Sequence, residues 1–222
     1  GEEPVRGVVL ASVNEAAAEA LVTEMRGRVG VPIYRVGRDV GLPLRHSLSE
    51  AAIERTGQDR LLNAVAAFDS ARQAVVVVDA GTAITVDFVD GEGVFCGGAI
   101  AAGVRASLGA LAERAPALPR VELREPAEGA FGVDTEEAML QGVKYGAQGL
   151  VRRLVERYAM AYEAYPMVVA TGGDAAFLFE DDELVDRVVP HLTLRGIAVA
   201  CQRSIGVGGD LGGGAGAGPG GG

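Results

Sequence analysis

The chain has 222 residues, of which 49% are hydrophobic and 23% charged, and its formal net charge is −10. This composition excludes a disordered chain and fits one large or two small globular domains. The 20 basic residues form no run or stripe, so we expect no nucleic-acid partner. The longest purely aliphatic run, residues 74–78, is far shorter than the ~20 residues of a membrane span, so we expect no membrane partner.

The N-terminal part, residues 1–72, is expected to form an α/β domain. Its apolar residues recur at strand and helix spacing and predict a strand, a helix, a second strand, an irregular stretch and a second helix. These segments are residues 7–12, 15–27, 32–36, 37–56 and 58–68. A strand–helix–strand order predicts that the two strands pair in parallel.

Residues 73–205 are expected to form a second α/β domain that opens with an antiparallel meander. The expected segments are strands over 74–78, 84–89 and 94–100, a helix after Gly103, a long helix over 135–162, a strand over 167–171, a short helix, and a closing apolar segment. Gly142, Gly146 and Gly149 in the long helix predict close packing against a neighbour.

Glycine is overrepresented, with 33 residues, and eleven of these lie in residues 206–222. We expect those last residues to be a Gly-rich flexible tail. The two cysteines, Cys96 and Cys201, have no metal-ligand spacing. They are expected to be buried small residues in a reducing compartment, which favours a cytoplasmic protein.

The segment Asp79-Ala-Gly-Thr82 directly follows a buried strand. A carboxylate at a strand end can bind a cation, and a glycine lets the backbone approach a phosphate. The threonine hydroxyl and nearby N–H groups can donate to phosphate oxygens. The alternative is an ordinary Asp-Gly turn of a hairpin, which is common.

The segment Gly57-Gln58-Asp59-Arg60 stands at the start of a predicted helix. Asp59 could accept a hydroxyl proton while Arg60 holds a carboxylate or phosphate of the substrate. The alternative is structural, because an acidic residue in the first turn stabilises the helix dipole.

Three further segments allow both a structural and a functional interpretation. Two of them are glycine-rich: the glycines at 97, 98 and 103, and the segment Thr171-Gly-Gly-Asp174. Their backbone N–H groups can converge on a bound anion, or the glycines can simply allow tight packing. Asp134 and Thr135 fit a helix N-cap. His46 and His191 have no partner in the sequence and receive no catalytic role.

Taken in order, these motifs resemble type III pantothenate kinases. The matching segments are Gly57-x-Asp-Arg60, Asp79-Ala-Gly-Thr82, Gly97-Gly-Ala-Ile-x-x-Gly103, Ala117-Leu-Pro119, Thr135-x-Glu-Ala-Met139 and Thr171-Gly-Gly173. The resemblance extends from about Gly7 to Arg203. It implies an actin-like ATPase (ribonuclease H-like) fold of two related α/β domains, usually in a homodimer.

The resemblance also implies an activity and a set of roles. The family transfers the γ-phosphate of ATP, with Mg²⁺, to pantothenate, giving 4'-phosphopantothenate in the first step of coenzyme A biosynthesis. Asp59 would be the base, and Gly57, Gln58, Asp59 and Arg60 would line the pantothenate site. Thr135 would contact pantothenate across the dimer interface. Asp79 would bind a monovalent cation, K⁺ or NH₄⁺, and Thr82 would touch ATP.

One departure from the family pattern is large. The family opens with a strand and an Asp-x-Gly-Asn-Thr motif, and this chain has no such motif. We therefore expect an incomplete form with the first domain truncated and weak turnover of ATP. Two alternatives stay open: a non-catalytic accessory or regulatory relative of the same fold, and a kinase of this fold with another small acceptor.

Overall fold

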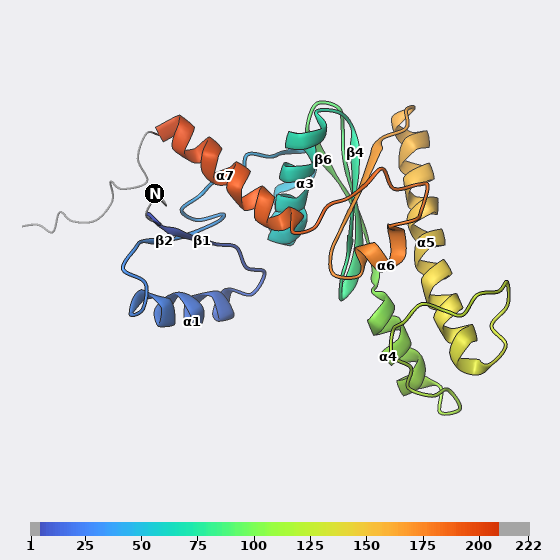
Figure 1. The fold of residues 1–222 in the computed structure, drawn as a ribbon. Coiled ribbons are helices and arrows are strands. Elements are labelled where there is room, and N and C mark those ends of the chain that lie inside the picture. The colour runs from blue at the N-terminus through green and yellow to red at the C-terminus, as the bar shows by residue number, and fades with distance from the viewer. Residues whose placement is uncertain (1–4, 209–222) are drawn as a thin grey trace, which may run out of the picture.

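The computed structural model describes residues 5–208, which form two β-sheets joined by helices (Figure 1). The smaller sheet pairs β1 (Val8–Leu10) with β2 (Ile33–Arg35) in parallel, and α1 (Glu15–Arg26) connects the two strands. The predicted strand–helix–strand unit is therefore confirmed.

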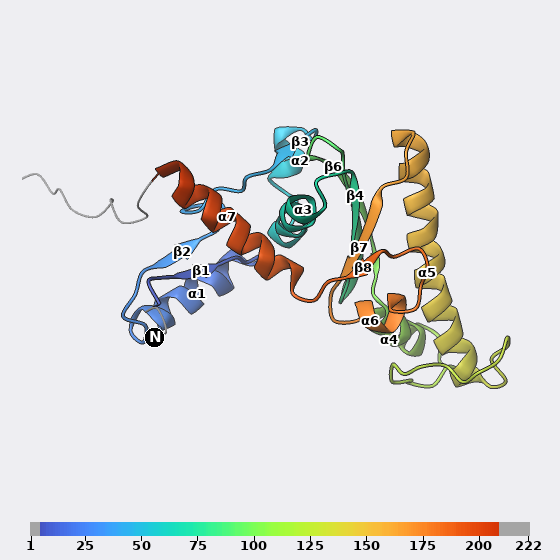
Figure 2. The same cartoon turned by 45° about the horizontal axis from the view of Figure 1, so that its top comes forward.

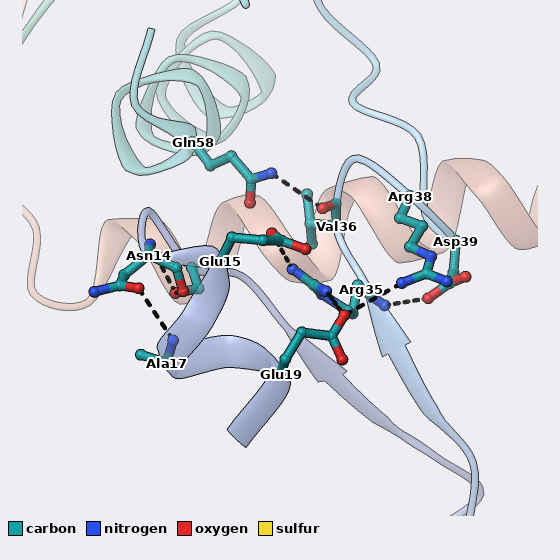
Figure 3. A network of polar contacts seen from close by, with 10 residues as sticks. Asn14, Glu15, Ala17, Glu19, Arg35, Val36, Arg38, Asp39 and Gln58 are labelled. Carbon is teal, nitrogen blue, oxygen red and sulfur yellow. Dashed lines mark hydrogen bonds and ion pairs between the residues drawn. The ribbon is translucent and has the colours of Figure 1, made fainter. Parts of the chain in front are cut away.

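Ion pairs hold α1 against β2 in this N-terminal unit (Figure 3). The Arg35 guanidinium donates to Glu15 at 2.5 Å and to Glu19 at 2.7 Å, two acids one helical turn apart on α1. Asn14 caps the helix, since its side-chain oxygen accepts from the Ala17 N–H at 3.0 Å.

The larger sheet has six strands in the order β3-β6-β5-β4-β7-β8. Its strands are β3 (Arg45–His46), β4 (Val75–Ala80), β5 (Ala83–Val89), β6 (Val94–Ala102), β7 (Met167–Thr171) and β8 (Arg187–Val188). An antiparallel β4–β5–β6 meander continues into β7 and β8, which run parallel to β4. This is the strand order of a ribonuclease H-like fold, so the expected fold class is confirmed.

Helices cover both faces of this sheet (Figure 2). Successive strand residues point to opposite faces, and β4 is apolar on both. Its Val75 and Val77 pack beneath α3 (Gln58–Ala71), whereas Val76 and Val78 pack beneath α5 (Thr135–Tyr162). Everything carried by α3 therefore lies across the sheet from α5.

The last helix, α7 (Leu192–Gly208), runs from the large sheet to the N-terminal unit (Figure 1). Leu192 packs in the core beneath α3, and Ala200 packs with Val36 and Val40 beside β2. A Cβ added at Gly196 would lie 2.2 Å from the Leu62 carbonyl oxygen, so this glycine permits backbone contact between α3 and α7.

The predicted long helix and the strand β7 have the predicted bounds. The closing apolar segment forms the helix α7, which continues through Gly208. The first residues of the expected tail, 206–208, are therefore helical, and residues 209–222 lie outside the described residues. The short helices are α2 (Glu50–Ile53), α4 (Val104–Arg114) and α6 (Ala175–Phe179). In the described part, no helix is long and apolar enough to cross a bilayer.

Two expectations about packing are wrong. Cβ atoms added at Gly142, Gly146 and Gly149 would meet no described atom within 4 Å, so within one copy these glycines do not permit close contact with a neighbouring element. Cys96 is exposed rather than buried, since Phe95 takes the core-facing position of β6 and its neighbour points the other way.

Candidate active site

Three turns meet at the ends of β4, β6 and β7. The Gly103 N–H donates to the Thr82 carbonyl at 3.0 Å, which joins the β6–α4 junction to the β4–β5 turn. The Asp174 N–H donates to the Ala80 carbonyl at 2.9 Å, which joins the turn after β7 to the same point. Motifs separated by more than ninety residues in the sequence therefore form one site.

The glycines in these turns are needed for this approach. A Cβ at Gly103 would lie 2.0 Å from the Gly81 carbonyl oxygen. Gly172 has a φ of 101°, and a Cβ there would lie 2.3 Å from the Ala80 carbonyl oxygen. A Cβ at Gly173 would meet no described atom within 4 Å, so its backbone faces open space. Exposed turns of this kind, at the carboxyl ends of strands, suit a phosphate.

Asp79 lies in β4 just before these turns and is held by an asparagine of α3. The Asn63 amide nitrogen donates to Asp79 Oδ2 at 2.7 Å. Burial raises the pKa of Asp79, and the hydrogen bond from Asn63 opposes that shift. The other oxygen, Oδ1, faces the turn after β7, where a Cβ at Gly172 would lie 2.6 Å from it.

Asp59 is exposed in the first turn of α3, where its Oδ1 accepts from the Arg60 N–H at 2.9 Å. Burial is the main cause of the raised pKa of Asp79 and Asp87, and the Asp59 charge adds to both shifts. An accessible acid one helical turn before Asn63, which contacts Asp79, can act as a base toward a bound hydroxyl.

Arg60 is fixed by a buried partner. Its Nε donates to the two Asp87 oxygens at 3.2 and 3.0 Å, and its Nη2 also contacts Asp87. Burial raises the pKa of Asp87, which is only 2% exposed, while Arg60 opposes this shift. A Cβ at Gly98 would lie 2.3 Å from Asp87 Oδ1, so that glycine of the Gly97-Gly98 pair makes room for the ion pair.

Gln58 points toward the N-terminal unit (Figure 3). Its side-chain amide donates to the Val36 carbonyl at 3.2 Å. The helix start at Gly57 thus connects the predicted acceptor motif to β2 and the loop that follows it.

Thr135 lies apart from the other predicted residues. It is exposed at the N-terminus of α5, where Asp134 caps the helix by accepting from the Glu137 N–H at 2.9 Å. Because α5 and α3 cover opposite faces of the sheet, one copy of the chain does not bring Thr135 to Asp59.

Three neighbours of the site were not assigned a role from the sequence. Asn63 follows Asp59 by one helical turn and stands among buried apolar residues, which was a usable signal. Thr193 donates to the Asn63 side chain from the distant α7, and no local pattern indicates this contact. Arg105 of α4 donates to the buried Asp174 at 3.1 Å and closes the turn after β7.

A ribonuclease H-like sheet whose glycine turns meet at the carboxyl ends of its strands fits a protein that binds and transfers phosphate. The chain belongs to the type III pantothenate kinase family: residues 1–157 match the family model of that description. It is 34% identical over 206 residues to a type III pantothenate kinase of Geotalea uraniireducens, covering 92% of this chain and 78% of that protein. It is 35% identical over 208 residues to that of Frankia alni, covering 92% and 81%.

A solved structure from Campylobacter jejuni, described as a Baf family transcriptional activator, shares the fold. It covers 90% of this chain and 84% of its own, with a TM-score of 0.61 and 21% identity. The family, the fold class and the kinase function predicted from the sequence are thus confirmed. Membership implies the use of ATP with a divalent metal and of pantothenate as substrate.

Proposed function

We propose that this chain carries out the family reaction through the residues predicted from its sequence. The pantothenate hydroxyl oxygen attacks the γ-phosphorus of ATP, its proton passes to the Asp59 carboxylate, and ADP leaves with the electrons of the broken P–O bond. The main supporting observation is that α3 carries the exposed Asp59 one helical turn before Asn63, whose side chain donates to Asp79 at 2.7 Å.

The acceptor side of the proposed site is the start of α3. Asp87 occupies Nε and Nη2 of Arg60, and Nη1 is proposed to donate to pantothenate. Because Asp87 neutralises the charge of Arg60, the substrate would be held mainly by hydrogen bonds from the Arg60 N–H groups and less by a net positive charge. The Gly57 backbone and the Gln58 side chain would complete this side.

The nucleotide side is the set of glycine turns. The exposed Thr82 is proposed to contact ATP, whose Mg²⁺ would neutralise phosphate charge. Asp79 is proposed to bind K⁺ or NH₄⁺ with Oδ1, on the side that Gly172 keeps free of a side chain. The described residues hold no cluster of three or more His, Cys, Asp or Glu that fits a metal ion. The remaining ligands of this cation would therefore be carbonyl, water or nucleotide oxygens.

A homodimer would bring Thr135 to the acceptor site of a second copy. The open face of α5 forms an apolar groove of about 660 Å³ with α4, β5 and β6. Residues that line it include Ile84, Ala101, Leu111, Gly142, Gly146 and Leu150. The glycines that face open space within one copy would then pack against the other. We also place the protein in the cytoplasm, where its two free cysteines would stay reduced.

Product formation tests this proposal directly. Purified chain with ATP, MgCl₂, KCl and pantothenate should yield phosphopantothenate by mass spectrometry, at the weak turnover expected from the sequence. Asp59→Asn should lower this rate by about 10²–10⁴-fold. Glu54→Gln removes the same charge at an exposed position five residues earlier in the sequence, and should retain the wild-type rate.

Binding measurements separate the alternatives. Calorimetric binding of nucleotide without pantothenate would indicate a kinase of this fold with another acceptor. Binding of pantothenate without formation of phosphopantothenate would indicate a non-catalytic relative. Full activity of Asp59→Asn would show that the base is another group.

A further inference from the structure

We propose that Asn63 and Thr193 are positioning residues that fix the direction of the Asp79 carboxylate. This inference rests on the proposed role of Asp79 at the nucleotide side. It concerns three side chains, from α7, α3 and β4, that are connected by hydrogen bonds next to the glycine turn after β4.

Two hydrogen bonds of normal length link these three side chains. The Thr193 hydroxyl donates to the Asn63 side-chain oxygen at 2.8 Å, and the Asn63 side-chain nitrogen donates to Asp79 Oδ2 at 2.7 Å. Asn63 is 2% exposed, so water cannot readily replace either partner. A buried polar group left without its partner is costly, which makes this arrangement strongly preferred.

The Asp79 carboxylate selects the donor end of the Asn63 amide, and Thr193 holds the other end in place. A carboxamide has a donor end and an acceptor end of nearly equal size, and rotation by 180° exchanges them. An ionised carboxylate only accepts hydrogen bonds, whereas the Thr193 hydroxyl can donate or accept and here donates to Asn63 Oδ1, which anchors that end of the amide. The donor end then faces Asp79; the reverse orientation would set an amide oxygen against a carboxylate oxygen.

This arrangement leaves Asp79 Oδ1 for the turn after β7. With Oδ2 occupied by Asn63, the second oxygen faces Gly172, where a Cβ would lie 2.6 Å from it. The uncharged Asn63 amide thus fixes the rotamer of Asp79 through Oδ2, and Oδ1 stays available for a ligand at the turn.

The backbone contact between α3 and α7 holds Thr193 in reach. Gly196 lies one turn after Thr193, and its missing side chain lets α7 approach the Leu62 carbonyl next to Asn63. Asn63 also follows Asp59 by four residues on α3, so the helix that carries the proposed base also orients the proposed cation ligand.

The test compares Thr193→Val, which keeps the shape and removes the hydroxyl, with Thr193→Ser, which keeps the hydroxyl. Calorimetry measures the affinity for Mg·ADP at increasing KCl, with choline chloride maintaining ionic strength. We expect Thr193→Val to raise the half-saturating KCl concentration, or the ADP dissociation constant at high KCl, about tenfold. Thr193→Ser should stay within about twofold of the wild type, and pantothenate affinity should not change in either variant.

Asp79→Asn separates this inference from the cation role. If the wild type shows no potassium dependence, the cation role is wrong, and the inference then requires Asp79→Asn and Thr193→Val to weaken ADP binding in parallel. Wild-type nucleotide and potassium dependence in a folded Thr193→Val would overturn the positioning role. Equal defects in the Val and Ser variants would overturn it as well, because they would indicate packing.

Discussion

The acidic side chains of the site differ in what surrounds them, although each lies near the others. Asp59 is exposed, Asp79 is partly buried and bonded to a neutral amide, and Asp87 is buried and bonded to a guanidinium. Environment therefore assigns the roles: the accessible carboxylate suits proton transfer, and the buried one suits holding Arg60.

The ion pair between Asp87 and Arg60 should contribute strongly to folding. Asp87→Asn leaves a guanidinium, 15% exposed, without its counter-charge, and we expect it to lower the free energy of unfolding by about 3 kcal/mol. Asp69→Asn is the matched control, because its exposed partners Arg72 and Arg203 should make it cost less than about 1 kcal/mol. Urea denaturation of the three proteins measures the difference; equal losses would refute the buried pair.

The pKa of Asp79 predicts a pH dependence of stability with a definite sign. Burial raises its pKa in the folded state, so the folded protein binds this proton more tightly than the unfolded chain does. The stabilising contribution is complete below the unfolded pKa, near 4, and is lost as the pH rises through the folded pKa. Asp79→Asn removes this dependence.

The stability difference between Asp79→Asn and the wild type should thus shift in favour of the variant as the pH rises from about 4 to 7. Denaturation curves at several pH values, at constant ionic strength, measure it. A difference that stays constant over this range would show that Asp79 titrates alike in both states.

At the scale of elements, local pattern predicted what local interactions determine. The apolar run before Asp79, the Thr135–Tyr162 helix and the strand Met167–Thr171 all follow from side-chain periodicity. The closing helix α7 was missed as a helix because glycines and β-branched residues weaken its local signal, and packing against α3 supplies what the sequence lacks.

The same distinction holds for the site. Asp59, Asp79 and the turn glycines stand at element ends, where sequence marks them. The link from Thr193 to Asn63 spans 130 residues, and no spacing rule connects them. Contacts of that kind depend on how α3 and α7 cross, which only the folded chain specifies.

That crossing gives a prediction about helices. Gly196→Ala places a Cβ 2.2 Å from the Leu62 carbonyl oxygen, so the helices must separate, and we expect a loss of about 1–3 kcal/mol. Gly109→Ala, in α4, meets no described atom within 4 Å and should gain about 0.5–1 kcal/mol from helix propensity. Thermal and urea unfolding should give opposite signs for the two; a neutral Gly196→Ala would contradict the close contact.

At the scale of the whole molecule, the proposed site is divided between two faces of one sheet. α3 carries Asp59 on one face, and α5 carries Thr135 at its exposed end on the other. A substrate touched by both requires two copies arranged so that each supplies what the other lacks. The apolar groove along α5 suits that contact, because its glycines admit a close approach.

This arrangement predicts that assembly and pantothenate binding fail together. Gly146→Arg puts a charged side chain into the groove at a position where an added Cβ meets no described atom within 4 Å, so the fold should persist while the dimer dissociates. Gly109→Arg introduces the same side chain on α4 at a position that does not line the groove, and should remain dimeric. Sedimentation velocity gives the oligomeric state, and calorimetry gives pantothenate affinity, expected to fall at least tenfold for Gly146→Arg alone. A monomeric wild type that binds pantothenate would refute the shared site, as would a monomeric Gly146→Arg with unchanged affinity.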